Sequence, residues 1–331
     1  MKNKINNFKI YNYDDWTLNC GEKSLFCILM NFGINPMILM QDYVNFYVLE
    51  DKVLRQKSKS LNGNQVERFL NSGLRFDRKA DSPDIVNDII QSIDKQRPVV
   101  INIDFFYDKL RADVYQKRHG YHFLLIYGYD SENRTFNIID HNHANSYYYD
   151  DFVMDFETLI ECYNGYRENI GNQGEYTFSS YYKIQENCYM PDFYYQKKNF
   201  KTLVDNVDLC MQGIEYLDEF IRFYDMCLTS EQKFTENFEV LYASVEDINS
   251  TILRRNFTDT KLFRGHPFID ENISVITNNW KLIKAIFVKY ITLRQNSDKN
   301  KFYKCSGLLK EISELEKQNC NEIKRIGDYV K

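Results

Sequence analysis

Long apolar runs are missing from this sequence. None of its segments approaches the ~18 consecutive apolar residues that a membrane-spanning helix needs. Residues 1–15 also lack the apolar stretch of a signal peptide, because Asn, Tyr and Asp follow the first lysines. We therefore expect a protein of the cytoplasm that has no membrane partner.

An excess of positive charge is missing as well. The chain has 42 Lys and Arg against 47 Asp and Glu, which gives a net charge of −5 at pH 7. General affinity for nucleic acids depends on clustered Lys and Arg that bind the phosphate backbone. The composition therefore argues against a nucleic-acid partner.

Cysteine pairs with the spacing of a metal site are a third absence. The eight cysteines include no CxxC pair and follow no regular spacing. His141 and His143, beside Asp140, are residue types that bind metals, but no third histidine lies nearby, so we favour a loop there. We expect reduced thiols, no metal and no bound cofactor.

The length of 331 residues favours two domains over one. Strand patterns concentrate between Pro98 and Ile184. The runs 123–129 and 135–140 are separated by a turn-forming segment, so we expect them to pair as an antiparallel hairpin. Helical patterns precede these strands. We therefore predict that residues 1–190 form an α+β domain of helices plus an antiparallel sheet.

Strand patterns disappear after Pro191, and apolar residues recur there at three- and four-residue spacing. Residues 191–331 are therefore predicted to form an all-α helical bundle domain. The expected helices cover roughly 203–221, 231–256, 272–294 and 302–328.

Cys20 follows a polar loop and directly precedes an amphipathic pattern at 21–31. A thiol at a helix N-terminus is stabilised as the thiolate, which is the form that attacks carbonyl carbons. Gly21 lets a substrate approach the backbone closely. Taken alone, a cysteine here is more often a small residue that happens to begin a helix.

His122 opens the apolar strand that follows the Gly120-Tyr121 turn, and the next strand ends at Asp140. In an antiparallel pair these two residues return to the same level. A carboxylate there holds the imidazole in one tautomer. The combination favours catalysis, with Cys20 as nucleophile, His122 as base and Asp140 as the residue that orients the base.

Three segments together resemble a known family: Cys20-Gly21, the strand 120–130 and Ile138-Ile139-Asp140. They resemble the papain-like fold of the peptidases that cleave bacteriocin leaders. They are still more similar to relatives in antibiotic pathways, of the butirosin acyltransferase type and the closthioamide type. The resemblance covers roughly residues 10–185. It implies a papain-like catalytic half followed by a helical half, with Cys20, His122 and Asp140 as the catalytic residues.

The chain departs from the leader peptidases at two positions. Asp14 stands six residues before the nucleophile, where those peptidases usually carry a glutamine that helps to bind the oxyanion. An anionic side chain would oppose the developing oxyanion, so we expect the Cys20 amide to act with Asn19 or Trp16 instead. Glu22 replaces a common proline, and no ATP-binding or transmembrane segment is present. These differences favour acyl transfer over proteolysis.

The resemblance to the pathway enzymes implies the two substrates. The acyl donor is expected to be the phosphopantetheine thioester of an acyl or peptidyl carrier protein, and the acceptor a small amine. The product is then an amide made in antibiotic biosynthesis. Asp14, Tyr121 and Tyr148 are our candidates for substrate binding, and Asp15 and Asp104 are further acidic candidates for a charged amine.

Two alternatives stay open. The first is a cysteine peptidase or amidase of the leader-peptidase type, because water in place of the amine gives hydrolysis. The second is a papain-like binding protein without catalysis, in which the helical half recognises a partner and Cys20 has no chemical role.

Overall fold

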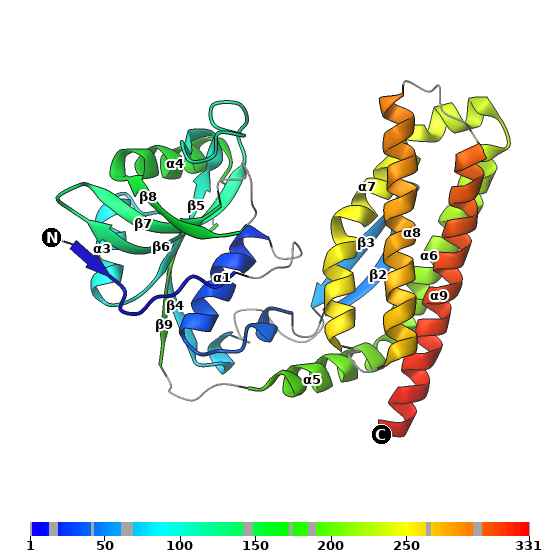
Figure 1. Ribbon diagram of the computed structural model, residues 1–331, viewed down its shortest axis with the longest axis horizontal. Coiled ribbons are helices and arrows are strands. Elements are labelled where there is room, and N and C mark those ends of the chain that lie inside the picture. The colour runs from blue at the N-terminus through cyan, green and yellow to red at the C-terminus, as the bar shows by residue number, and fades with distance from the viewer. Residues whose placement is uncertain are drawn as a thin grey trace. The chain divides into compact units, whose positions relative to one another are not determined.

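The computed structural model describes residues 2–12, 19–40, 43–60, 69–141, 148–171, 175–184, 190–262, 266–293 and 300–330. It divides into two compact units, shown in Figure 1. The first unit consists of residues 1–39 and 64–191, and the second of residues 40–63 and 192–331.

The first unit contains an antiparallel sheet in the order β4-β9-β5-β6-β7-β8, and a short strand, β1, pairs with β6. Helix α4 packs against β5, and helices α1 and α3 pack against β6. This unit has the expected α+β architecture, and β6 and β7 form the expected hairpin. Its elements are β1 (Lys2–Lys4), α1 (Cys20–Asn31), β4 (Leu74–Lys79), α3 (Ile85–Asp94), β5 (Val99–Asp104), β6 (Tyr121–Asp130), β7 (Thr135–Asp140), β8 (Asp150–Asp155), α4 (Phe156–Asn169) and β9 (Phe178–Lys183).

A one-residue bulge at Tyr127 decides which residues of the β6–β7 hairpin share a face. Gly128 pairs with Asn137. On the other side of the bulge the register is shifted by one residue, so that Leu125 pairs with Ile139. Asp140 therefore reaches the level of Leu124, whose side chain is on the same face as that of His122. Without the bulge, Asp140 would lie opposite Leu125 and face the other side of the sheet.

The second unit is a helical bundle, as expected after residue 191. Its helices bury a large aromatic and aliphatic core that includes Trp280, Phe287 and Phe302. Among the described residues, no helix has both the length and the apolarity to cross a membrane. The helices are α5 (Asp192–Asp205), α6 (Val207–Leu228), α7 (Glu231–Leu262), α8 (Pro267–Thr292) and α9 (Asn300–Val330).

A two-stranded hairpin, β2 (Tyr43–Glu50) and β3 (Val53–Ser60), also belongs to the second unit. The sequence patterns did not predict it. Tyr47 and Leu54 are buried in the core of the helical unit. The Leu54 amide donates a hydrogen bond to the Ser244 hydroxyl at 2.9 Å. Apolar burial therefore groups residues 40–63 with the helices, although they precede most of the first unit in the sequence.

Candidate active site

Cys20 is the first residue of α1, and a capping box fixes this helix start. The Asn19 side chain accepts a hydrogen bond from the Glu22 amide at 2.9 Å, and the Glu22 carboxylate accepts one from the Asn19 amide at 3.1 Å. Two of the backbone donors at the helix end are thereby satisfied. Asn19, an expected oxyanion donor, thus has its side-chain oxygen committed to the helix cap.

The surroundings of the Cys20 thiol lower its pKa. The imidazole of His122 and the backbone N–H groups of Phe123 and Gly21 are the groups that act on it. Burial alone would raise the pKa of this thiol, but the hydrogen bond and charge of His122 outweigh it, so the pKa lies below its ordinary value. These contacts favour the thiolate.

His122 and Asp140 form a buried pair. The His122 Nε2 atom lies 2.9 and 3.0 Å from the two carboxylate oxygens of Asp140, and both side chains are at most 5% exposed. Asp140 Oδ1 also accepts a hydrogen bond from the His141 amide at 2.7 Å. With Nε2 engaged by the carboxylate, Nδ1 is the ring nitrogen left to exchange a proton with Cys20.

The charges of this pair support one another. Burial opposes the imidazolium, but the Asp140 carboxylate and Cys20 raise the pKa of His122 to about 10. Burial likewise opposes the Asp140 carboxylate, but His122 and the His141 amide hold its pKa below the ordinary value. The arrangement therefore favours a Cys20 thiolate beside a His122 imidazolium, with Asp140 ionised behind it.

The other thiols on the same helix and in the core have the opposite character. Burial raises the pKa of Cys27, which lies two turns along α1, to about 11, and that of Cys305 to about 11. A buried thiol with a raised pKa is a poor nucleophile at neutral pH. The chemistry of Cys20 thus comes from its surroundings rather than from its residue type.

Gly21 and Phe123 fix how closely α1 approaches β6. A Cβ atom at position 21 would lie 2.9 Å from a ring carbon of Phe123, so only glycine leaves room for the ring. Tyr121 packs edge-on against Phe123, with ring centroids 5.8 Å apart, and is 57% exposed. The Phe123 ring thus lies against the residue that follows Cys20, and the role predicted for Tyr121 in substrate binding stays a prediction.

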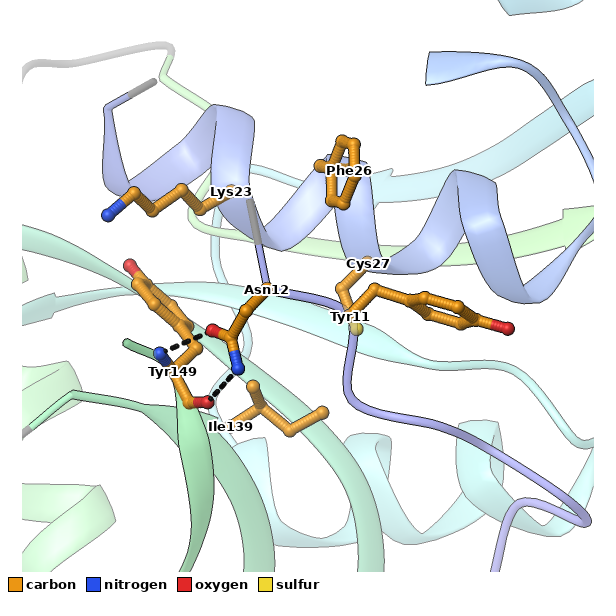
Figure 2. A pocket seen from close by; sticks show the side chains of 7 residues that line it. All are labelled: Tyr11, Asn12, Lys23, Phe26, Cys27, Ile139 and Tyr149. Atoms are coloured by element: carbon orange, nitrogen blue, oxygen red, sulfur yellow. Dashed lines mark hydrogen bonds between the residues drawn. The ribbon is translucent and has the colours of Figure 1, made fainter. Parts of the chain in front are cut away.

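A small pocket lies between α1 and the end of β7 (Figure 2). The Asn12 side chain forms two hydrogen bonds with the backbone of Tyr149. It donates to the carbonyl at 2.9 Å and accepts from the amide at 2.7 Å. The Lys23 ammonium lies over the Tyr149 ring, 5.3 Å from its centroid. Figure 2 shows the Tyr149 ring extending toward Lys23. The pocket is lined by Tyr11, Asn12, Lys23, Phe26, Cys27, Ile139 and Tyr149.

Lys23 adds a cation to the site, and the sequence motifs did not predict it. Burial lowers the pKa of its ammonium, while the charges of Cys20 and Asp140 act in the opposite direction. Lys23 is thus within electrostatic range of both anions of the site. Its position three residues after Cys20 on a helix is the sequence signal that could have revealed it.

Asp108 is a second carboxylate near the pair. It is completely buried, and its Oδ2 atom has no hydrogen-bond partner among the described residues. Burial, followed by the charge of Asp140, raises the pKa of Asp108 to about 6. No sequence pattern marked this residue.

Three residues of types that bind metals also meet here. The ligand atoms of His122, Asp140 and His141 lie within 4.8 Å of one another. His122 and Asp140 already bond to each other at this point, so a metal ion would have to displace that pair. The expectation of no metal stays a prediction, and His143 lies outside the described residues.

The remaining predicted site residues have different positions. Asp14, Asp15 and Trp16 lie outside the described residues. Tyr148 is 56% exposed. Asp104 is completely buried and bonds to His119 instead of facing solvent.

Comparison with known families gives one match. Residues 63–207 match the model of the Peptidase_C39 like family. This match supports a papain-like cysteine enzyme. It includes His122 and Asp140 but begins after Cys20, so the choice of nucleophile rests on the geometry described above. A search of curated proteins gave no match.

Proposed function

We propose that this chain is a cysteine-dependent acyltransferase that forms amides through an acyl-enzyme on Cys20. The observation that carries the proposal is the position of the Cys20 thiol at a helix N-terminus, where His122 and backbone N–H groups lower its pKa. A thiolate in this position is suited to attack a thioester or amide carbonyl.

The two half-reactions need only the residues of the site. The Cys20 thiolate attacks the donor carbonyl, and the His122 imidazolium gives its proton to the departing thiol. Neutral His122 then takes a proton from the amine as it attacks the Cys20 thioester, and the thiolate leaves. Asp140 holds the ring in one orientation throughout. The Cys20 amide is one oxyanion donor, and Trp16 and Asn19 are candidates for a second.

The proposed donor is an acyl group on the phosphopantetheine arm of a carrier protein, and the proposed acceptor is a small amine. The resemblance to antibiotic-pathway acyltransferases supports this choice. The aromatic pair of Tyr121 and Phe123 supports it as well. The Phe123 ring lies against Gly21, and apolar rings near a nucleophile shield a thioester from water. On this proposal the enzyme acts in the cytoplasm and needs no cofactor of its own.

Hydrolysis of a peptide or amide is the second candidate. The match of residues 63–207 to the Peptidase_C39 like family favours it. The same acyl-enzyme would form, and water would replace the amine. The product, free acid or amide, separates the two functions.

The test is intact-mass analysis after incubation with an acyl thioester, with and without a diamine. We expect the wild type and Cys27→Ala to gain the acyl mass, and Cys20→Ala to gain none. Cys27 is the matched control because it lies on the same helix. Release of the adduct as an amide supports transfer, whereas release as the free acid in the presence of the diamine supports hydrolysis. A folded protein that gains no adduct from thioesters and cleaves no peptide would leave only the binding-protein alternative.

A further inference from the structure

Three consecutive basic residues precede the strand that carries His122. Lys117, Arg118 and His119 are all exposed, and β6 begins two residues later. The chain as a whole has a net charge of −5. This basic segment before β6 therefore differs in sign from the protein's overall charge.

His119 is exposed but held in one orientation. Its Nδ1 atom lies 2.6 Å from the buried Asp104 carboxylate, and its ring stacks on Phe106 with centroids 4.1 Å apart. Asp104 also accepts hydrogen bonds from the amides of Phe106 at 3.0 Å and Gly120 at 3.1 Å. The carboxylate thus engages one ring nitrogen of His119 and leaves Nε2 for another partner.

Arg118 and Lys117 keep their charges available. The Arg118 guanidinium lies over the Phe105 ring, 5.6 Å from its centroid, and the Lys117 ammonium donates to the Ala112 carbonyl at 2.7 Å. Neither partner carries a negative charge. In the described parts of the chain, no carboxylate forms an ion pair with Lys117 or Arg118.

The segment lies within reach of a substrate bound at Cys20. Asp104 pairs with Tyr121 across the β5–β6 ladder, which places the anchor of His119 beside the residue that precedes His122. Arg118 precedes His122 by only four positions, so their backbones are at most about 14 Å apart. A long, flexible donor can span this distance while its thioester lies at Cys20.

We propose that Lys117, Arg118 and His119 bind a phosphate group of the acyl donor. The inference rests on the proposed function and narrows it to donors that carry a phosphate at a distance from the thioester. A phosphate offers several acceptor oxygens to a guanidinium and an ammonium at once, and to Nε2–H of His119 when its ring is protonated. Charge-assisted hydrogen bonds of this kind are the strong ones. A phosphopantetheine arm has this arrangement of groups.

The experiment compares two donors that differ only in the phosphate, acetyl-pantetheine and acetyl-4′-phosphopantetheine. Intact mass gives the second-order rate of acylation of the wild type with each donor. We expect the phosphorylated donor to react about tenfold faster, and this ratio to fall as salt is added. The Lys117→Ala/Arg118→Ala variant should bring the ratio to about one.

Lys95→Ala is the matched control. Lys95 is exposed at the C-terminal end of α3, just before β5 begins. Asp104, which anchors His119, lies at the other end of β5. This variant should keep the wild-type ratio. Equal rates for the two donors in the wild type, or a full ratio in the double variant, would overturn the phosphate site while leaving acyl transfer intact. A wild type that is acylated by neither donor would contradict the proposed function, and the phosphate site would fall with it.

Discussion

His122 Nε2 contacts both carboxylate oxygens of Asp140, at 2.9 and 3.0 Å. The pairing of β6, which carries His122, with β7, which carries Asp140, shifts by one residue along the hairpin. The bulge at Tyr127 absorbs the shift, and its carbonyl accepts a hydrogen bond from the Ile5 amide at 2.9 Å. The pair is buried, so its mutual attraction is only weakly screened by solvent. The charge on Asp140 should therefore control the reactivity of Cys20 through His122.

Asp140→Asn tests this control, since it keeps the size of the side chain and removes its charge. The pKa of His122, now about 10, should fall, and that of Cys20 should rise. We expect alkylation of Cys20 by iodoacetamide at pH 6 to slow about tenfold, because one pKa unit is a factor of ten in the thiolate population. Asp84→Asn, at the exposed cap of α3, is the control. An unchanged pH profile in Asp140→Asn would show that the carboxylate does not set the charge of the site.

Asp108 should make stability depend on pH in the opposite direction from a paired carboxylate. Its pKa is raised to about 6 in the folded protein, against 3.8 for an ordinary Asp. The folded state therefore binds the Asp108 proton more tightly than the unfolded state does. The stabilisation that this gives is fully present below pH 3.8 and is lost as the pH rises through 6. Asp108→Asn should raise the free energy of unfolding by about 2–3 kcal/mol at pH 8 and change it little at about pH 3.5.

Urea denaturation at the two pH values measures this difference. The amide oxygen that Asp108→Asn introduces can still accept the hydrogen bond that the Leu110 amide donates to Asp108 at 3.0 Å, so the turn is preserved. Asp84→Asn, at the exposed cap of α3, is the control and should show no such pH dependence. Equal effects of Asp108→Asn at the acidic and the alkaline pH would contradict the raised pKa.

The sequence predicted the parts of the site that have local signals. A cysteine before an amphipathic pattern and a histidine at the mouth of an apolar strand are visible without a structure, and the β6–β7 turn brings Asp140 back toward His122. The bulge at Tyr127 was not visible. Simple alternation continued from Gly128 would have placed Asp140 on the wrong face, so the meeting of the two residues depends on a feature that the pattern does not contain.

Long-range burial explains the parts that the sequence did not predict. The hairpin of β2 and β3 belongs to the helical unit because Tyr47 and Leu54 are buried in its core, and no local pattern says which core a strand joins. Asp108 resembles any loop aspartate until its complete burial is known. Both cases depend on residues that are distant in the sequence.

Gly21→Ala should impair the site without unfolding the protein. The added methyl group would lie 2.9 Å from the Phe123 ring, so α1 and β6 must move apart or the ring must turn. Because the Phe123 backbone lowers the pKa of Cys20 and Phe123 follows His122 directly, we expect acylation to slow at least about tenfold. Phe123→Leu in the same chain should restore part of the rate by removing the clash.

Gly307→Ala is the control for the glycine substitution. A Cβ at position 307 meets nothing within 4 Å, and the residue lies inside α9. This variant should keep the wild-type rate, and its unfolding free energy should rise by up to about 1 kcal/mol from helix propensity. A Gly21→Ala protein with a normal acylation rate would show that the contact with Phe123 does not set the distance between Cys20 and His122.

Lys23 occupies a position that local rules oppose. It lies in the first turn of α1, where the helix dipole disfavours a cation, and burial lowers the pKa of its ammonium. The compensation comes from Cys20 and Asp140, whose charges favour the protonated lysine. Attraction between charges is mutual, so Lys23 should in turn favour the Cys20 thiolate.

Lys23→Met and Lys23→Arg test this coupling, because one removes the charge and the other keeps it. We expect alkylation of Cys20 at about pH 6 to slow about two- to threefold in Lys23→Met, with the same limiting rate at high pH, where the thiol is fully ionised. Lys23→Arg should keep the wild-type profile. A parallel loss of rate at every pH in both variants would instead assign Lys23 a packing role against Tyr149.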